Sequence, residues 1–479
     1  RIICRAVFYL ALLRDFSQGS PLNFVKGRKN NMLQKLFFLL YGLLWAIAKP
    51  LLKKHKRLRE GYEERIIGGA WQNLAEKEPV SIWIQAASGG EAYLTLALLK
   101  YLTKEHEEHG HLHILCTSMT RQGMEVLQKG KSAFETAWQE KQKGKCPEIS
   151  LCYFPFDDKK SMEKAFALAR PKICILLETE LWPNFMRLCK DMKSLLYVVN
   201  ARMNEKTYKA YRKIKTIFAG YNPDIIFATR QKDKEYYQEI FAQSRCEFMH
   251  NIKFDTVYQE LCLAMQAKNE NSLQKVFAPK LCVYLFASVR QEEEPELLPL
   301  VEKLHTAKTK SVFCIVPRHV ARFGEWKKAL QEKGLPVRFA SELFEKNAQM
   351  QAQDIVIWDR FGDLKELYAL ADYVFVGGSL VPLGGQNFLE ALVYGRIPHT
   401  GIHLHNFLWT FEMQNGSKNL VEENLLCLHE SFAMLSETFL ALPEEKFTQH
   451  TKIQERFKIW LKPLIGDTKK IMDEILEKV

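Results

Sequence analysis

The stretch "VSIWIQAASGGEAYLTLALLKYL", residues 80–102, decides how the chain folds. Its first eight residues form a nearly continuous apolar run, which is typical of a parallel β-strand covered on both faces. Two glycines follow, and after them comes a longer segment with the character of a helix. A strand that runs directly into a helix is the start of a βαβ unit.

The same alternation of strand and helix continues on both sides of a polar segment, "AKNENS" at residues 267–272. Five more strands are expected before it and four after it, at residues 112–118, 149–156, 172–178, 194–200, 224–230, 281–288, 311–317, 354–359 and 373–379. Such units build doubly wound sheets with right-handed crossovers. We therefore predict an α/β chain with two Rossmann-like doubly wound domains facing across a cleft, and a length of 479 residues suits two domains.

The composition is that of a globular protein with a formal net charge of +12. An excess of cations suggests a negatively charged partner, which could be nucleic acid, an anionic membrane or a phosphorylated substrate. Basic residues are not interleaved with aromatic residues in one patch, so we predict no nucleic-acid partner. The 11 cysteines include no C-x-x-C pair, and "HEEHGHLH" at 106–113 matches no zinc signature, so neither disulfides nor a metal site are expected.

An apolar segment, "LFFLLYGLLWAIA" at residues 36–48, precedes the first domain. Extended to Leu33–Leu52, it reaches the roughly 20 residues that span a bilayer. The cations that follow suit anionic headgroups and place the rest of the chain on the cytoplasmic face: Lys53, Lys54, Lys56, Arg57 and Arg59. We predict a membrane-associating helix, and a buried helix of the soluble fold is the alternative.

Two segments that follow strands of the first half carry carboxylates. Glu91 stands three residues after Ser88, which is the spacing of a helix capping box, and at a ligand-binding edge it could also act as a general base. In "ETELWPN", residues 178–184, Glu178 and Glu180 follow another strand, where one carboxylate can raise the pKa of the other. Either could instead cap the next helix.

The second half offers candidate phosphate ligands after its strands. Arg318 and Arg322 follow the strand at 311–317 and could bind a phosphate or form surface ion pairs. A glycine-rich loop comes after the strand at 373–379, and its proposed phosphate-binding residues are Gly377, Gly378, Ser379, Gly384 and Gly385. It leads to Asn387 and Glu390, which have capping-box spacing. The loop is neither a dinucleotide fingerprint nor a P-loop, so a phosphate cradle and a structural turn both remain open.

Several strings together resemble the Kdo transferases, bacterial enzymes that attach 3-deoxy-D-manno-oct-2-ulosonic acid (Kdo) to lipid A. They occur in the family's order from about Met32 to the C-terminus: "ASGGEA", "ETELWPN", "NAR", "IKFD", "PRHVARF" and "FVGGSLVPLGGQNFLEA". The resemblance implies a GT-B fold, inversion at the anomeric carbon, CMP-Kdo as donor, a lipid A precursor as acceptor and no metal or other cofactor. It also implies attachment to inner membrane lipids, at the cytoplasmic face of the bacterial inner membrane.

The resemblance also implies roles for single residues. Glu91 matches the general base, and Glu178 or Glu180 with Lys253 matches positions that stabilise the transition state. The residues that match the CMP-binding segments are Pro317, Arg318, Phe361, Gly362, Asp363, Asn387, Phe388, Leu389 and Glu390. The chain departs from the family pattern at Gln85, His250, Asp363, Gln386 and Phe388. Gln85 replaces a histidine, so the donor affinity and the pH dependence are in doubt.

The expected organisation has five parts. Residues 1–31 form a candidate upstream extension, because the chain begins with Arg1 and Met32 follows a polar stretch; 32–60 hold the membrane helix and basic stretch; 61–270 form the acceptor domain; 271–445 form the CMP-sugar domain; and 446–479 return to the first domain as a helix. The alternatives are another GT-B enzyme with a UDP-sugar donor and a non-catalytic membrane-bound relative.

Overall fold

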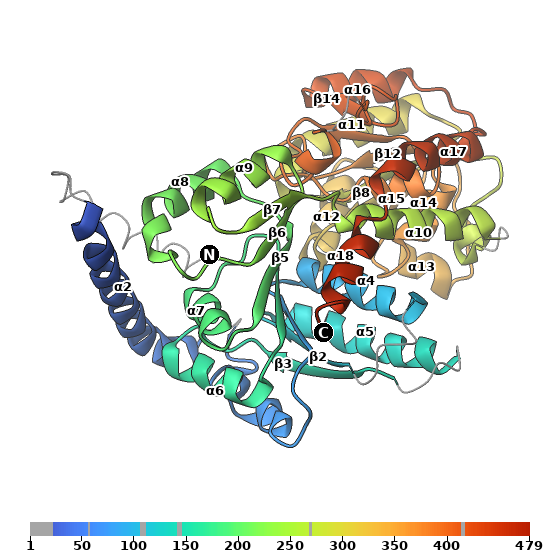
Figure 1. Cartoon of the computed structure of the whole chain (residues 1–479). Helices are drawn as coiled ribbons and strands as arrows, with labels where there is room; N and C mark the ends of the chain where they lie inside the picture. Colours follow the sequence, from blue (N-terminus) through green and yellow to red (C-terminus); the bar gives the residue numbers. More distant parts are fainter. Residues whose placement is uncertain (1–22, 56–57, 106–111, 141–145, 268–270, 413–416) are drawn as a thin grey trace. The chain divides into compact units, whose positions relative to one another are not determined.

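The computed structural model describes residues 23–55, 58–105, 112–140, 146–267, 271–412 and 417–479 (Figure 1). The chain forms two compact units: unit 1 is Arg1–Lys253 with Gly466–Val479, and unit 2 is Phe254–Ile465. The sequence places the boundary near residue 270, whereas the units divide at Lys253. Phe254 lies in the core of unit 2, where its ring packs against Trp409 and Trp460, and this contact draws the start of the helix that follows into that unit.

Unit 1 is built on a sheet of seven parallel strands in the order β3-β2-β1-β4-β5-β6-β7. Their bounds are β1 Ile82–Ala86, β2 His113–Ser118, β3 Glu148–Tyr153, β4 Ile173–Leu177, β5 Leu195–Ala201, β6 Ile225–Ala228 and β7 Arg245–Phe248. The six strands expected in this half are all present, and β7 is an addition. Strand order reverses between β1 and β4, and in open α/β sheets the ligand site lies at such a switch point, beyond the carboxyl ends of the strands.

Helices cover both faces of this sheet. They are α3 Tyr62–Arg65, η2 Gly69–Leu74, α4 Gly89–Glu105, α5 Arg121–Glu140, α6 Lys159–Ala169, α7 Pro183–Asp191, α8 Glu205–Ile214, η3 Lys215–Ile217 and α9 Gln231–Ile240. Residues of α4 and α5 pack into one apolar cluster, and those of α6, α7, α8 and α9 pack into another. The sequence predicts a surface loop over 128–148, but α5 continues to Glu140, because Phe134 and Trp138 are buried on its inner face.

Unit 2 repeats this plan with a parallel sheet in the order β10-β11-β9-β8-β12-β13-β14. The strands are β8 Cys282–Val289, β9 Ser311–Pro317, β10 Val337–Phe339, β11 Ile355–Ile357, β12 Tyr373–Val376, β13 Pro398–Gly401 and β14 Cys427–His429. The four strands expected here are present, whereas the short strands β10, β13 and β14 were not predicted. The switch point of this sheet lies between β8 and β12.

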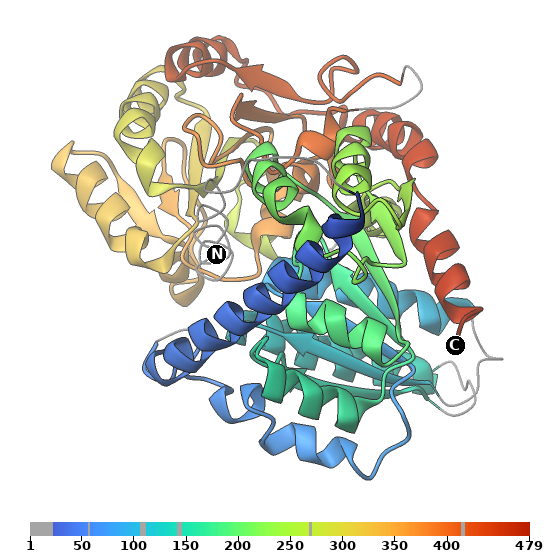
Figure 2. The ribbon, with the colours of Figure 1, turned by 60° about the vertical axis from the view of Figure 1, so that its left-hand side comes forward.

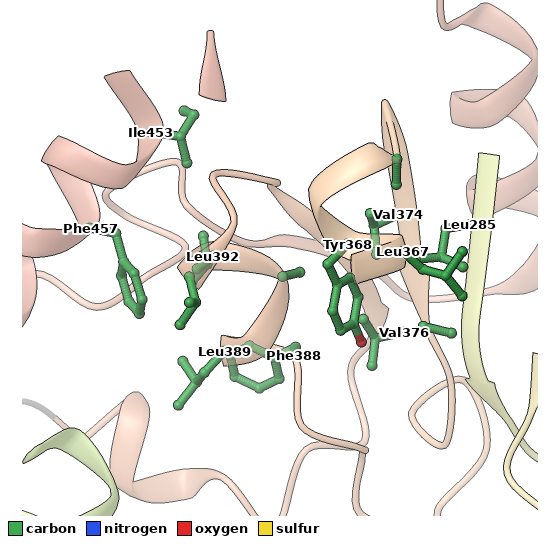
Figure 3. Packing of buried hydrophobic residues seen from close by; sticks show 14 of the residues in the cluster. Leu285, Leu367, Tyr368, Val374, Val376, Phe388, Leu389, Leu392, Ile453 and Phe457 are labelled. Atoms are coloured by element: carbon green, nitrogen blue, oxygen red, sulfur yellow. The ribbon is translucent and has the colours of Figure 1, made fainter. Parts of the chain in front are cut away.

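The helices of unit 2 pack with this second sheet. They are α10 Ile252–Gln266, η4 Ser272–Val276, η5 Gln291–Glu293, α11 Glu294–Ala307, η6 Val320–Arg322, α12 Phe323–Glu332, α13 Ala340–Glu345, α14 Leu364–Leu370, α15 Leu389–Val393, η7 Leu408–Thr410, α16 Phe432–Ala441, α17 His450–Leu461 and η8 Lys462–Leu464. Figure 3 shows part of the core, in which side chains of α14 and α15 pack with those of β8 and β12. The α/β class with two doubly wound domains, as in GT-B enzymes, is thereby confirmed.

The last helix, α18 Asp467–Leu476, joins unit 1, whereas α17 stays with unit 2. Asp467 accepts hydrogen bonds at Oδ2 from the backbone N–H of His250, at 2.7 Å, and from its Nδ1, at 2.9 Å. Farther along α18, the Tyr101 hydroxyl donates to Asp473 at 2.9 Å. His250, where the family pattern has glycine, therefore serves to hold the returning helix.

The N-terminal helix α2, Asn23–Leu52, lies along unit 1, as both views of the ribbon show (Figures 1 and 2). Its stretch Met32–Leu52 is long and apolar enough to cross a membrane. Of the candidate upstream extension 1–31, residues 1–22 lie outside the described part of the chain, and the remainder belongs to α2.

Candidate active site

Glu91 lies in the first turn of α4, directly after β1 and at the switch point of the unit 1 sheet. Its carboxylate accepts hydrogen bonds from the backbone N–H of Ala87, at 2.6 Å, and from the hydroxyl of Ser88, at 3.1 Å. Glu91 therefore caps the start of its helix, as the spacing to Ser88 predicts. Its side chain is also buried.

The pKa of Glu91 is raised to about 8, first by burial and then by the charges of Glu180 and Glu178, which outweigh the hydrogen bonds from Ala87 and Ser88. A carboxyl group with a pKa near the working pH can both accept and release a proton, which is what a general base requires. The capping role and the chemical role are thus compatible in one residue.

Glu178 follows β4, the strand next to β1, and its backbone has φ of 57°. This left-handed conformation is uncommon for a residue with a side chain and has to be held by its surroundings. The Tyr237 hydroxyl donates to the Glu178 carbonyl at 3.2 Å, and the carboxylate forms an ion pair with Arg202. The "NAR" string thus supplies the counterion of Glu178, a role that the sequence does not reveal.

Glu180 and the start of α7 complete this loop. Burial raises the pKa of Glu180, and the nearby charge of Glu178 raises it further. The N-terminus of α7 is held by buried Asp157, whose carboxylate accepts from the backbone N–H groups of Asn184, at 3.0 Å, and Phe185, at 2.9 Å. Burial raises the pKa of Asp157 to about 7 despite these bonds. No sequence motif singled out this residue.

Lys253 lies at the start of α10, where unit 1 ends. Burial lowers its pKa, whereas the charges of Glu178 and Glu91 act in the opposite direction. The turn before it is fixed by Asn200, which has φ of 57° and accepts from the Ile252 N–H at 3.0 Å. Unit 1 thus brings Glu91, Glu178, Glu180 and Lys253 within electrostatic range of one another.

Several side chains near this region have buried polar groups without a hydrogen-bond partner among the described residues, including Nε2 of Gln85. The amide N–H groups of Asn200 and Asn251 are buried and have no hydrogen-bond partner among the described residues. Gln85 is also fully buried, and its Oε1 accepts from the Thr117 hydroxyl at 2.6 Å. Gln85 therefore belongs to the interior of the sheet, where it pairs with a neighbouring strand.

In unit 2, the two arginines predicted as phosphate ligands differ in their contacts. Arg322 forms ion pairs with Glu294 and Glu325, so it takes the surface ion-pair role. Arg318 is exposed and makes no side-chain hydrogen bond or ion pair within the described ranges. It follows Pro317, the last residue of β9, and is close enough to influence the pKa of Glu390. Arg318 is therefore available to a ligand phosphate.

The N–H groups of Gly378 and Ser379, which were predicted to bind phosphate, make hydrogen bonds within the chain itself. The carboxylate of buried Glu293 accepts from the N–H groups of Gly378, Ser379 and Leu380, at 2.7, 3.1 and 3.2 Å. A carboxylate of the chain itself thus occupies the place of a bound anion. Glu293 reaches this loop because η5, which follows β8, and the loop that follows β12 meet at the switch point of this sheet.

The second glycine pair, Gly384 and Gly385, also belongs to a turn that is hydrogen-bonded within the chain. The Gly385 N–H donates to the Gly378 carbonyl at 2.7 Å, and both Gly384 and Gly385 have positive φ, 95° and 82°. A Cβ atom on Gly384 would lie 2.2 Å from Nδ2 of Asn406. These glycines are required by a tight, internally bonded turn, which is the structural alternative that the sequence left open.

The segment after this loop also differs from the prediction. Asn387 and Glu390 bond side chain to side chain, Nδ2 to Oε1 at 2.8 Å, and burial raises the pKa of Glu390. Phe388 and Leu389 are buried in the core (Figure 3). The Phe388 ring lies 4.9 Å from that of Phe407. The side chains of Phe388 and Leu389 therefore cannot contact CMP, since they pack inward beneath the turn.

A separate segment, Phe361–Gly362–Asp363, combines a fixed turn with an exposed ring. Asp363 accepts from the indole N–H of Trp358, at 3.1 Å, and from Arg360, at 2.9 Å. Gly362 has φ of 92°, and the Phe361 ring is 78% exposed. An exposed aromatic ring on a fixed turn is suited to stacking on a flat base.

The described residues include no cluster suited to a metal ion. Within the described residues, no group of three or more His, Cys, Asp or Glu side chains could hold a metal ion. The string "HEEHGHLH" lies outside these residues except for Leu112 and His113. His113 is buried, and its ring nitrogens lie 2.7 Å from the Glu78 carbonyl and 3.0 Å from the Ser150 hydroxyl.

Residues 60–256 match the family model described as 3-deoxy-D-manno-octulosonic-acid transferase (kdotransferase). The 3-deoxy-D-manno-octulosonic acid transferase of Haemophilus influenzae is 27% identical over 399 residues, which cover 80% of this chain and 86% of that protein. Over this part of its length, the chain is similar to the Kdo transferases. A plant relative, the probable mitochondrial Kdo transferase of Arabidopsis thaliana, is 26% identical over 77% of this chain and 80% of its own length.

Another relative is longer. The bifunctional glycosyltransferase/methyltransferase of Fusobacterium nucleatum is 29% identical over 371 residues, which are 77% of this chain and 54% of that protein. The chain thus spans about half the length of this relative. Among solved structures, the C-terminal CMP-Kdo binding domain of WaaA from Acinetobacter baumannii matches 43% of the chain and 97% of its own length, at 24% identity and a TM-score of 0.32. HepE of Anabaena in complex with UDP matches 84% and 99%, at 11% identity and a TM-score of 0.47.

Proposed function

We propose that the chain is an inverting glycosyltransferase that moves Kdo from CMP-Kdo to a lipid A precursor, lipid IVA, in lipopolysaccharide biosynthesis. The observation that carries this proposal is Glu91, a buried carboxyl group at a sheet switch point with a pKa of about 8. The family's relatives, named as Kdo transferases, indicate which sugar the carboxyl group serves.

In the reaction, ionised Glu91 takes the proton of the acceptor hydroxyl. The freed oxygen then attacks the anomeric carbon of Kdo from the side opposite CMP, and the bond between that carbon and the phosphate oxygen breaks. CMP leaves with the electron pair, so the configuration at the anomeric carbon inverts. Protons and charges balance, because Glu91 ends protonated and the phosphate carries the negative charge.

Several polar and aromatic side chains are candidates for binding the donor. In unit 2, Arg318 and the Phe361 ring are exposed, and we propose that they bind the phosphate and the cytosine of CMP. Lys253, with the unpartnered amide N–H groups of Asn200 and Asn251, offers donors for the carboxylate of the sugar acid. Because a single phosphate leaves, cationic side chains suffice, and we propose that no metal is needed.

The acceptor is a lipid, so we also propose attachment to the cytoplasmic face of the bacterial inner membrane. Helix α2 carries apolar side chains that remain exposed on unit 1, and the sequence after it is basic. Anionic headgroups attract such a segment.

The test is transfer of Kdo from CMP-Kdo, generated in situ, to the tetra-acylated lipid A precursor in the presence of EDTA. Glu91→Gln keeps the size and an acceptor oxygen for the helix cap but cannot take a proton. It is expected to lose about 10²- to 10⁴-fold in rate. Glu125→Gln, on exposed α5, is the matched control and should retain full activity.

Four results would contradict the proposal. Full activity in Glu91→Gln would remove Glu91 as base, and loss of activity with EDTA would remove the metal-free mechanism. Lack of product with CMP-Kdo, together with tight binding of a UDP-sugar, would favour a GT-B enzyme with another donor. If neither nucleotide binds, the non-catalytic relative is the better interpretation. Product mass would also count the Kdo residues added.

A further inference from the structure

The length of α2 permits two placements in a membrane. Met32–Leu52 comprises 21 residues, which at 1.5 Å per residue extend about 30 Å, the thickness of the hydrocarbon core. A helix of this length can cross the bilayer or can lie along its surface. The contacts of the helix with unit 1, and not its length, have to decide between them.

One face of α2 is packed onto unit 1. Phe37, Tyr41 and Trp45, four residues apart and therefore on one side of the helix, are all buried. The Trp45 ring lies 5.3 Å from that of Phe156, and the Tyr41 hydroxyl donates to Asp157 at 3.0 Å. The centre of α2 is therefore part of the unit 1 core.

Both ends of the stretch Met32–Leu52 are also tied to unit 1. Near the N-terminal end, the Gln34 amide donates to the Ile217 carbonyl at 3.1 Å and to the Ala219 carbonyl at 2.6 Å. Near the C-terminal end, Lys49 forms an ion pair with Asp158 at 2.9 Å. Because contacts occur at the start, middle and end of this stretch, Met32–Leu52 is held along its length.

The opposite face of α2 is apolar and exposed. Its side chains recur every three or four residues, so they form one stripe along the helix: Met32, Leu36, Leu39, Leu43, Ile47 and Leu51, which are 48–70% exposed. A continuous stripe of this kind on a water-facing surface marks an interaction site. We call these six residues the outer stripe.

Exposed cations flank the outer stripe at both ends. Close to Gln34, α8 and η3 carry Lys206, Lys209, Arg212, Lys213 and Lys215, all exposed. Glu205 and Glu239 pair with some of them, and a positive excess remains. At the other end, Lys53, Lys54 and Arg59 are exposed. An apolar stripe between clusters of cations is complementary to a lipid surface with anionic headgroups.

We propose that α2 does not cross the bilayer but lies in the plane of one leaflet, with the outer stripe among the acyl chains and unit 1 on the water side. The inference refines the membrane attachment stated under the proposed function. A spanning helix would have to leave Phe37, Tyr41 and Trp45, or would pull Asp157 and charged Lys49 and Asp158 toward hydrocarbon. The first alternative would expose buried aromatic side chains, and the second would bring charged groups into hydrocarbon. The in-plane placement avoids both free-energy costs.

The first experiment measures on which side of the membrane each end of α2 lies. Cysteine is introduced at Met32 or at Leu51 in the full chain, and a nitrobenzoxadiazole label is attached. Inverted inner-membrane vesicles are then treated with dithionite, which reduces only labels that it can reach from the outside. The unaltered chain gives the background from its native cysteines.

If α2 lies in the plane, both labels are reduced to the same extent, and quenchers placed in the lipid report one shallow depth. If α2 spans the bilayer, the label at residue 32 is protected while that at residue 51 is reduced, and a label at Leu43 is deepest. The spanning pattern would overturn the inference. These readouts do not require Kdo transfer, so failure of the proposed reaction would leave them intact.

The second experiment tests the outer stripe and the cations. The triple variant Leu39→Glu, Leu43→Glu, Ile47→Glu should release the chain into the soluble fraction with an unchanged circular dichroism spectrum. Leu263→Glu and Ile459→Glu alter apolar residues of unit 2 that are equally exposed. These two variants should remain bound to the membrane. Lys206→Glu with Lys213→Glu should weaken binding to phosphatidylglycerol vesicles about fivefold for each cation lost. Continued membrane binding of the triple variant would overturn the proposal.

Discussion

Glu91 caps the start of a helix and is the proposed general base, and the two roles depend on the same surroundings. Burial next to Glu178 and Glu180 raises the pKa of Glu91 to about 8, while Ala87 and Ser88 orient its carboxylate. Around it, Arg202 and Tyr237 fix the strained backbone of Glu178. The single residue thus acquires its chemistry from neighbours that lie far away in the sequence.

The raised pKa of Glu91 predicts the pH dependence of transfer. A general base acts only when it is ionised, and below about pH 8 the protonated form of Glu91 predominates. We expect kcat/KM to rise about tenfold per pH unit up to about pH 8 and then to level off. Initial rates measured between about pH 6 and 9 test this expectation.

Glu180→Gln provides the control for this pH profile. It removes a like charge that helps to raise the pKa of Glu91, so the midpoint should move to lower pH. A profile that is flat, or that falls as the pH rises toward 8, would contradict the assignment of Glu91 as base.

At the scale of elements, the loop between β12 and α15 shows how a sequence pattern can be mistaken. Glycines before a helix suggest a phosphate site, yet Glu293 from η5 occupies the loop's N–H groups. The string "ASVRQEEE" contains this carboxylate, but three acidic residues in a row give no indication of which one turns inward. Only the packing of β8 beside β12 selects Glu293.

Removing the carboxylate of Glu293 should therefore destabilise unit 2. Glu293→Gln retains one acceptor oxygen and places an amide donor among backbone donors, which we expect to cost about 2–4 kcal/mol of unfolding free energy. Thermal or urea unfolding measures this loss. Glu292→Gln, at an exposed neighbouring position, should change the stability by less than about 0.5 kcal/mol.

The same variant tests whether the loop is a masked phosphate site. If the loop is structural, CMP binding measured by calorimetry should not tighten in Glu293→Gln. Tighter binding would mean that the freed N–H groups donate hydrogen bonds to the phosphate, and it would restore the interpretation based on the glycines.

The strands show what the sequence can predict at this scale. All ten expected strands occur, because each is a continuous apolar run buried on both faces. The missed strands, β7, β10, β13 and β14, are short and lie at or next to sheet edges. Polar residues such as Arg245 and Glu247 in β7 conceal the pattern. Such strands form because a neighbouring strand offers unpaired backbone groups.

For the whole molecule, the return of α18 to unit 1 joins segments that are more than 200 residues apart in the sequence, through His250 and Asp467. The pKa of Asp467 is lowered: burial would raise it, but hydrogen bonds and charge from His250 outweigh burial. A lowered pKa contributes stability above the ordinary carboxyl range, and this contribution is lost as the pH falls through the folded-state value.

We therefore expect Asp467→Ala to loosen α18 at neutral pH, with a loss of about 1–3 kcal/mol. Limited proteolysis followed by mass spectrometry should reveal faster cleavage near Gly466. Glu477→Gln, at an exposed site near the end of α18, is the control. In the native chain, the same cleavage should accelerate only below about pH 4. Equal cleavage of Asp467→Ala and the native chain would contradict this role.

The overall fold was easier to predict from the sequence than the contacts of the candidate site. The alternation of strands and helices predicted two doubly wound units. The order of the sequence strings predicted the resemblance to the Kdo transferases. The division at Lys253 and the separate fates of α17 and α18 depend on contacts such as Phe254 with Trp409, which no local pattern encodes. Glu91 and Glu178 were predictable because they follow strands, whereas Asp157 and Glu293 act through partners distant in sequence.

The two-faced packing of α2 has a practical consequence for purification. Deleting the segment to obtain a detergent-free preparation would uncover Phe156 and leave Asp157 without the Tyr41 hydroxyl, so the truncated chain should aggregate. Replacing the outward leucines with polar residues keeps the inner aromatic contacts. That substitution, and not truncation, is the rational route to a soluble form suitable for crystallisation.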